Sequence, residues 1–416
     1  MSLFAIRDYR YLFAAQIISL FGTGLATVAL GLLAYELAGP SAGTVLGTAL
    51  TVKMVMYVLI APLAAAYIHR LPRRAFLILL DVVRAGVVLA LPFVTEIWHV
   101  YVLIGLLQAA SAAFTPTFQA VIPAIVADET DYTRALSASQ VASTMESLLS
   151  PVLAAVALAF IDFSWLFLGT SAGFLLSALL IAPTRIPDAA PSAHAGAWAK
   201  AAAGIRTFLT TPQLRGVMAL NLVVAAAGSI VIVSTVNYVR DELGGSQQDV
   251  GWMLAASGAG TLLAALVLPR VLRRVAARAV MMAGAGTLVA ASATAVTLVA
   301  AGPDTWAGAA GLWAGTAGVW AVIGAGMALV ITPTGAILRA SVAPAAVPEV
   351  FAAQFSLSHL AWLITYPIAG WLGTAAGFTL TWSLLAALAA VGGVGAVLLW
   401  PRSIAAPMRA SLAKAA

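Results

Sequence analysis

The chain has 416 residues, of which 62% are hydrophobic and only 9% are charged. Soluble domains carry about 25% charged residues, so this composition excludes an ordinary water-soluble protein and indicates that lipid is the main solvent. The lack of cysteine excludes disulfides, thiolate metal sites and cysteine nucleophiles. The net charge of +6 comes from bases at the ends of apolar runs, which disfavours a nucleic-acid-binding surface.

Apolar runs long enough to cross a bilayer recur along the whole chain. A spanning helix needs about 20 apolar residues. Twelve runs meet this length, at residues 10–36, 44–68, 75–95, 99–126, 134–159, 163–183, 214–239, 249–270, 278–301, 308–338, 349–374 and 377–400. Arg7, Asp8 and Arg10 precede a first run that is too long for a cleavable signal peptide, so we expect this run to remain as a span.

The basic residues predict the orientation of these spans. They fall almost entirely on one side, at Arg7, Arg10, Arg70, Arg73, Arg74, Arg134, Arg185, Lys200, Arg206, Arg215, Arg270, Arg273, Arg274, Arg278, Arg339, Arg402, Arg409 and Lys414. The opposite loops hold mainly acids, with Arg240 as their one base. The positive-inside rule then predicts a multi-pass protein of the cell (inner) membrane with both termini in the cytoplasm.

A polar stretch divides the runs into two sets of six. It predicts an N-terminal bundle at 1–184, a cytoplasmic linker at 185–213 and a C-terminal bundle at 214–416. Within the linker, Trp198, Ile205 and Phe208 could share one side of a short amphipathic helix, with Lys200 and Arg206 on another. The expected fold class is an all-α integral membrane protein with twelve transmembrane helices in two pseudo-symmetric six-helix bundles.

Two short patterns recur in corresponding runs of the two sets. Phe114-Thr115-Pro116-Thr117 in the fourth run matches Ile331-Thr332-Pro333-Thr334 in the tenth. Ser150-Pro151-Val152-Leu153-Ala154 in the fifth matches Tyr366-Pro367-Ile368-Ala369-Gly370 in the eleventh. Parallel repeats of this kind build transporters with a cavity between two bundles.

The corner after the second run carries a family resemblance. It reads Ala65-Ala66-Tyr67-Ile68-His69-Arg70-Leu71-Pro72-Arg73-Arg74. With twelve runs and a central linker, it resembles the major facilitator superfamily, which has a Gly-x-x-x-Asp-Arg-x-Gly-Arg-Arg type motif there. The resemblance implies a secondary transporter that works by alternating access, without a cofactor.

Several segments look like one subgroup, the drug:proton antiporter-3 exporters, which include macrolide and siderophore exporters and have nickel-resistance exporters as relatives. They are residues 10–22, Leu33-Ala34-Tyr35-Glu36-Leu37-Ala38-Gly39, Asp81-Val82-Val83-Arg84 and Tyr238-Val239-Arg240-Asp241-Glu242-Leu243-Gly244. The chain departs from the pattern at His69, where the motif has Asp, and at Thr23, where the subgroup often has an acid. The fifth-run signature Gly-Pro-x-x-Gly-Gly survives only as Ser150-Pro151-Val152-Leu153-Ala154-Ala155.

Charged residues deep in the apolar runs are the candidates for proton coupling, because placing charge in hydrocarbon is costly. Glu146 lies near the middle of its run, where burial favours the protonated carboxyl. Lys53 could be its counter-ion, a contact for a substrate anion, or a side chain that snorkels to the surface. His359 could carry protons or bind metal, or could be a hydrogen-bonded packing residue. For Glu146 the alternative is a structural carboxyl that holds helices together.

The remaining polar residues suggest a cavity and a gate. Gln16, Gln108, Asn221 and Gln354 are candidates for substrate contact, or for hydrogen bonds between helices. The corner residues His69, Arg70, Arg73 and Arg74 could form a cytoplasmic latch that reaches acids such as Asp81. Asp81 and Arg84, spaced i, i+3, are gating struts by family analogy, or a shielded ion pair.

The family resemblance implies a proton-coupled exporter, and a cavity with mostly apolar walls and few charges suits small amphipathic compounds of the drug or siderophore type. Nickel or cobalt efflux is the alternative, and a non-transporting scaffold or lipid scramblase is a third possibility. No P-loop, HExxH motif or nucleotide-binding domain occurs, so no enzymatic activity is expected. The expected partners are a small-molecule substrate, protons and the bilayer, and the expected state is a monomer without bound metal.

Overall fold

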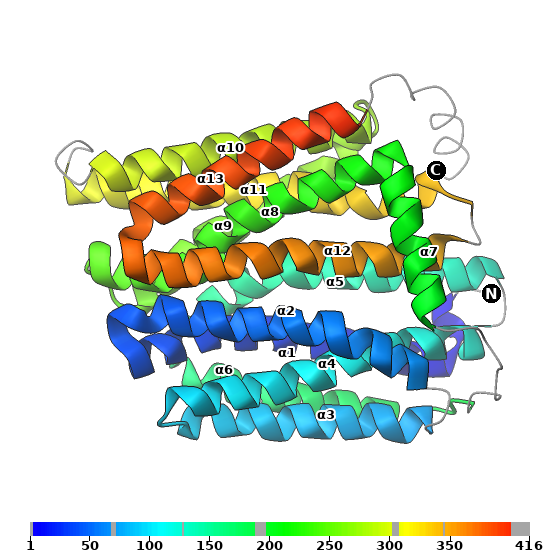
Figure 1. Cartoon of the computed structure of the whole chain (residues 1–416). Coiled ribbons are helices and arrows are strands. Elements are labelled where there is room, and N and C mark those ends of the chain that lie inside the picture. Colours follow the sequence, from blue (N-terminus) through cyan, green and yellow to red (C-terminus); the bar gives the residue numbers. More distant parts are fainter. Residues whose placement is uncertain are drawn as a thin grey trace.

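A computed structural model describes residues 3–67, 72–126, 129–187, 197–301, 308–343 and 346–400. Every regular element in these ranges is helical (Figure 1). The first six α-helices are α1 (Arg7–Ala38), α2 (Ala42–Tyr67), α3 (Arg73–Ala90), α4 (Ile97–Ile125), α5 (Glu129–Leu158) and α6 (Ser164–Ile181). The others are α7 (Ala197–Thr210), α8 (Pro212–Asn237), α9 (Gln247–Leu272), α10 (Ala277–Ala301), α11 (Ala309–Ser341), α12 (Val347–Pro367) and α13 (Gly373–Leu399).

Most of these helices have the length and composition to cross a membrane. Nine segments within the described residues qualify, and two of them, Arg7–Ile60 and Glu349–Leu399, include parts of two helices each. Large apolar side chains such as Phe160, Leu179 and Leu398 lie exposed on the outside. That exposure would be costly in water and is expected where helices face lipid. Helix α5 is not among the nine segments, so the prediction of twelve spans stays a prediction.

We call α1–α6 the N-terminal half of the chain and α8–α13 the C-terminal half. Helix α1 packs on α5 and α6, and α3 on α4 and α6; in the other half α8 packs on α13, and α11 on α9 and α10. The halves meet mainly where α2 packs on α12 and α5 on α9. Helix α7 crosses the other helices near the start of α1 (Figure 1) and packs on α12, α8 and α2. Its Phe208 is buried and its Arg206 exposed.

The two ends of the bundle differ in charge. We call the end where α1 and α3 begin and α9 finishes the arginine end, after Arg7, Arg73 and Arg274. The other end, where α1 finishes and α2 begins, is called the Tyr35 end. Two π-helical turns, Tyr238–Glu242 and Ile368–Leu372, lie there after α8 and α12. The second follows Pro367, which lacks the N–H that a regular α-helix uses.

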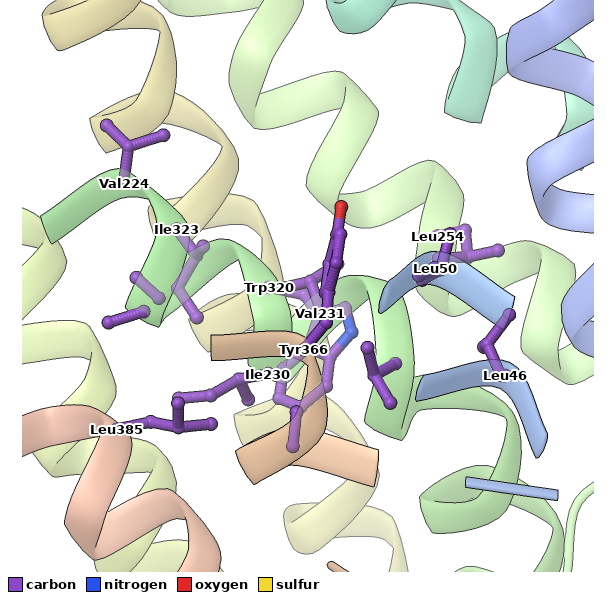
Figure 2. Packing of buried hydrophobic residues seen from close by; sticks show 14 of the residues in the cluster. Leu46, Leu50, Val224, Ile230, Val231, Leu254, Trp320, Ile323, Tyr366 and Leu385 are labelled. Carbon is purple, nitrogen blue, oxygen red and sulfur yellow. The ribbon is translucent and has the colours of Figure 1, made fainter. Parts of the chain in front are cut away.

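The buried apolar residues form two separate cores. The larger core joins the whole C-terminal half to the part of the N-terminal half nearer the Tyr35 end. Figure 2 shows Leu46 and Leu50 of α2 in this core with Val231 of α8 and Tyr366 of α12. The smaller core holds residues of the N-terminal half alone, such as Leu12, Leu77 and Phe118, toward the arginine end. Apolar packing between the halves is therefore concentrated at the Tyr35 end.

Candidate functional site

Three ionisable side chains lie on helices that carry the contact between the halves. Lys53 belongs to α2, Glu146 to α5 and His359 to α12. Each is in the middle part of its helix, and each is only half-buried. Partial accessibility so far from the helix ends is expected of side chains that border an internal, water-accessible space between the halves. The structure thus brings together the three residues that the sequence predicted as coupling candidates.

The position of the Glu146 side chain depends on a close approach between α1 and α5. A Cβ atom on Gly24 of α1 would lie 2.6 Å from Glu146 Oε1 and 2.1 Å from the Ser150 hydroxyl. A side chain at position 24 would therefore displace the carboxyl. Lys53 interacts electrostatically with both Glu146 and His359. Among the described side chains, however, Lys53 and Glu146 form no direct ion pair within 4.0 Å.

An aromatic group forms one wall beside these charges. It consists of Tyr57, one turn after Lys53 on α2, together with Phe355 and His359 of α12. The Tyr57 and His359 rings stack with centroids 5.0 Å apart and an interplanar angle of 7°. The Phe355 ring lies 4.1 Å from His359 and 5.4 Å from Tyr57. The group joins the two halves through flat, largely apolar surfaces.

The His359 ring has a defined tautomer. Its Nδ1 lies 2.6 Å from the Phe355 carbonyl oxygen. A carbonyl oxygen can only accept, so Nδ1 carries a proton and donates it. In the neutral ring, Nε2 then keeps its lone pair, and it can accept a hydrogen bond or a proton.

The predicted cavity residues fall into three different environments. Asn221 of α8 and Gln354 of α12 exchange two side-chain hydrogen bonds of 3.1 and 2.9 Å, within the C-terminal half. Gln16 of α1 accepts from Ser139 of α5 at 2.9 Å, within the N-terminal half. Gln108 of α4 is 4% exposed, and its Oε1 has no partner among the described residues. Gln354 therefore pairs with Asn221, rather than with His359 on its own helix.

In the structure, two of the predicted gate residues are not described, and the others make separate contacts. His69 and Arg70 lie outside the described residues. Arg73 begins α3, and Arg74 donates to the Thr184 carbonyl oxygen at 3.4 Å. The Arg74 contact stays within the N-terminal half.

Asp81 and Arg84 form a buried ion pair on α3. Ser177 of α6 donates to Asp81 Oδ2 at 2.7 Å. The Arg84 guanidinium lies 4.1 Å from the Phe114 ring centre and 4.5 Å from that of Phe174. The pair therefore joins α3 to α4 and α6 inside the N-terminal half.

The Tyr35 end is closed by polar and backbone contacts between the halves. Tyr35 donates to Asp241 Oδ1 at 2.6 Å, and Asn237 donates to the Pro40 carbonyl oxygen at 3.1 Å. A Cβ atom on Gly47 of α2 would lie 2.8 Å from the Gly370 Cα. At this end the backbones meet with no room for a side chain.

Comparison with known proteins decides the family. The model of the Major Facilitator Superfamily matches residues 12–236 and 217–415. The chain belongs to this superfamily. It is 25% identical over 287 residues to the uncharacterized MFS-type transporter YfiS of Bacillus subtilis (strain 168), covering 67% of each chain.

Solved structures of transporters have the same fold. A point mutant of the nucleoside transporter NupG aligns with a TM-score of 0.65 at 14% identity, covering 94% of this chain and all of that one. A bacterial homolog of the human lysosomal transporter Spinster, inward-facing and unoccupied, gives 0.65 at 13% identity, covering 94% and 97%. An auto-inhibited POT family peptide transporter gives 0.64 at 14%, covering 94% and 96%. This superfamily chain is therefore a multi-pass membrane protein of a transporter family.

Two members of the site were not predicted from the sequence. Tyr57 and Phe355 are aromatic residues in apolar runs, where most aromatics only pack or face lipid. Their spacing offered one signal, since Tyr57 follows Lys53 by four residues and Phe355 precedes His359 by four. Such pairs share a helix face.

Proposed function

We propose that this superfamily member is a secondary active transporter, a proton-coupled exporter of small amphipathic compounds. Residues 1–184 and 214–416 act as two six-helix bundles that rock about a central site and expose it to each side in turn. The observation that carries the proposal is the set Lys53, Glu146 and His359, half-buried on the helices where the two halves meet. Charges there need a functional reason, because lipid and protein core both penalise them.

The packing of the ends suggests which side the site faces. The halves are joined tightly at the Tyr35 end, whereas the N-terminal half keeps its own core at the arginine end. The positive-inside rule assigns the arginine end, with both termini, to the cytoplasm of the cell (inner) membrane. The arrangement then corresponds to a state that is closed outward and can admit substrate from the cytoplasm.

In this proposal, the Glu146 carboxylate couples the binding of a proton to the release of the substrate. Its carboxylate has competing positive partners in Lys53, a proton and any cationic group of a substrate. Binding of a proton neutralises the carboxylate and frees both Lys53 and the substrate from its attraction. Export would follow if substrate binds the deprotonated site facing the cytoplasm, and leaves when the site protonates facing outward.

The aromatic group favours an amphipathic organic substrate. Tyr57, Phe355 and His359 provide flat faces for a ring or apolar body, with charged groups beside them. For nickel or cobalt, the site lacks support within the described residues, where no group of three His, Cys, Asp or Glu could hold a metal ion. Metal efflux is thus the second candidate, and the scaffold or scramblase the third.

Flux measurements in liposomes test the proposal. The purified protein would be reconstituted, and uptake of ethidium, erythromycin and radioactive nickel measured with and without a pH gradient. We expect gradient-driven movement of an organic probe that Glu146→Gln abolishes. Glu36→Gln is the matched control, because Glu36 is an exposed carboxyl at the end of α1. Undiminished gradient-driven flux in Glu146→Gln would overturn the coupling role.

A further inference from the structure

Behind the central site, the N-terminal half contains buried polar atoms that have no protein partner among the described residues. Three of them are Gln108 Oε1 and Ser111 Oγ of α4 and Arg84 Nε of α3. Their residues are 4%, 3% and 2% exposed. A buried polar atom without a protein partner is costly, and in stable proteins it is usually bonded to an ordered water.

These atoms lie in one region. Gln108, Ser111 and Phe114 are spaced three residues apart, so they follow one face of α4. The Arg84 guanidinium lies over the Phe114 ring, at 4.1 Å from its centre. Arg84 therefore sits about one helical turn beyond Ser111 on the path from Gln108 toward the arginine end.

The same face of α4 packs on α2 next to the central site. A Cβ atom on Gly105, one turn before Gln108, would lie 3.7 Å from Val52 and 3.9 Å from Met56. Those two residues directly precede Lys53 and Tyr57 in the sequence. Tyr57 interacts electrostatically with both Arg84 and Glu146. The unpartnered atoms thus lie next to the Asp81–Arg84 pair, on the face of α4 that packs against the helix carrying Lys53 and Tyr57.

We infer that α2, α3 and α4 enclose a water-binding pocket, bounded by Tyr57, Arg84, Gln108 and Ser111, that relays protons between Glu146 and the Asp81–Arg84 pair. This inference rests on the proposed proton coupling and adds a route and a second carboxyl to it. In each step one O–H bond breaks as the next forms, so a single proton moves from one carboxyl to the other while Arg84 stays charged.

The groups that face the pocket restrict which residues can exchange protons. Helix α3 supplies Asp81 and Arg84, α2 supplies Tyr57 and Lys53, and α5 supplies Glu146. Helix α4 supplies the uncharged groups of Gln108 and Ser111, α6 supplies the Ser177 hydroxyl, and α12 adds His359 next to Tyr57. Asp81, bonded to both Arg84 and Ser177, is the one other carboxyl in this set.

X-ray footprinting tests for the water without any substrate. Irradiation turns bound water into hydroxyl radicals, which oxidise adjacent side chains and are detected by mass spectrometry. Phe114 borders the pocket, whereas Phe167 of α6 is a matched phenylalanine in the apolar core. We expect Phe114 to be oxidised at least about fivefold faster than Phe167, and the double variant Gln108→Leu/Ser111→Ala to remove the difference. Equal, slow oxidation of the two rings in the unmodified protein would overturn the pocket.

A transport assay tests the relay separately. With ethidium as the probe, we expect Ser111→Ala to reduce pH-gradient-driven uptake about tenfold while downhill ethidium exchange stays within about twofold. Ser171→Ala is the matched control, because its buried hydroxyl already donates to the Ala85 carbonyl oxygen at 2.9 Å. Unchanged gradient-driven uptake in Ser111→Ala overturns the relay. If the unmodified protein moves no probe, the proposed function fails instead, and footprinting still decides the pocket.

Discussion

The two ends of the contact between the halves are built differently. At the Tyr35 end, glycine backbones touch across the halves, and a hydrogen bond joins Tyr35 to Asp241. Toward the arginine end, the N-terminal half keeps a core of its own. An interface that is tight at one end and divided at the other is what one state of a rocking transporter requires. The contacts at the Tyr35 end must then break for the site to open on that side.

Widening a close backbone contact at the Tyr35 end should have the largest effect. Gly47→Leu would place side-chain atoms where the Gly370 backbone lies, with the first added atom 2.8 Å from its Cα. We expect the Tyr35 end to be wedged apart, and gradient-driven flux to fall more than about tenfold. Gly86→Leu on α3 is the control, since nothing lies within 4 Å of a Cβ there. Equal flux in the two variants would show that the tight end need not close.

The buried ion pair stabilises one half rather than the contact between halves. Asp81→Asn removes one partner and leaves Arg84 uncompensated, which typically costs about 3–5 kcal/mol of folding free energy. Replacing both, as in Asp81→Leu/Arg84→Met, should recover much of this loss. Thermal unfolding followed by tryptophan fluorescence measures both variants. If Asp81→Asn were as stable as the unmodified protein, the pair would not have this stabilising role.

Loss of the Tyr35–Asp241 hydrogen bond should have a smaller effect on the closure of the Tyr35 end. Tyr35→Phe removes one hydrogen bond between the halves, worth about 0.5–1.5 kcal/mol. The population open at the Tyr35 end should rise about two- to tenfold, as measured by the labelling rate of a cysteine at position 48. The control is Tyr101→Phe, because no described residue hydrogen-bonds the Tyr101 hydroxyl. If the labelling rate rises equally in both variants, the Tyr35 hydrogen bond does not hold this end closed.

The smallest effect is expected at the start of α9, at the Tyr35 end but outside the contact. Ser246 and Asp249 form a capping box, in which the Ser246 hydroxyl accepts from the Asp249 N–H at 3.3 Å. Ser246→Ala should cost about 1 kcal/mol of stability and leave the flux unchanged. A loss of flux comparable to that of Gly47→Leu would show that closure depends on this loop as well.

The sequence predicted the helices better than it predicted their contacts. Apolar runs end where arginines, prolines or loops begin, so the predicted run 249–270 lies within α9, and 278–301 within α10. These limits follow from local composition and the thickness of a bilayer. Glu146, Lys53 and His359 could be singled out from the sequence because isolated charge in an apolar run is unusual; their role in coupling stays a prediction.

Pairings between distant helices could not be predicted in the same way. Stacking of Tyr57 on His359 and the exchange of hydrogen bonds between Asn221 and Gln354 depend on how α2, α8 and α12 rotate about their axes. Helix rotation is set by packing over the whole bundle, and one sequence does not record it. The same holds for Gly47 and Gly370, since many glycines in these runs could have served as contact points.

The distances across both ends of the bundle test the central claim most directly. The natural chain has no cysteine, so spin labels can be placed in pairs without removing native residues. One protein would carry Ser41→Cys with Gln248→Cys at the Tyr35 end, and another Ala75→Cys with Ala276→Cys at the arginine end; all four residues are exposed. Double electron–electron resonance, measured at acid and at alkaline pH, should show that the distance between the labels increases in one pair and decreases in the other. Distances that stay fixed at both ends, or change in the same direction, would contradict alternating access in this protein.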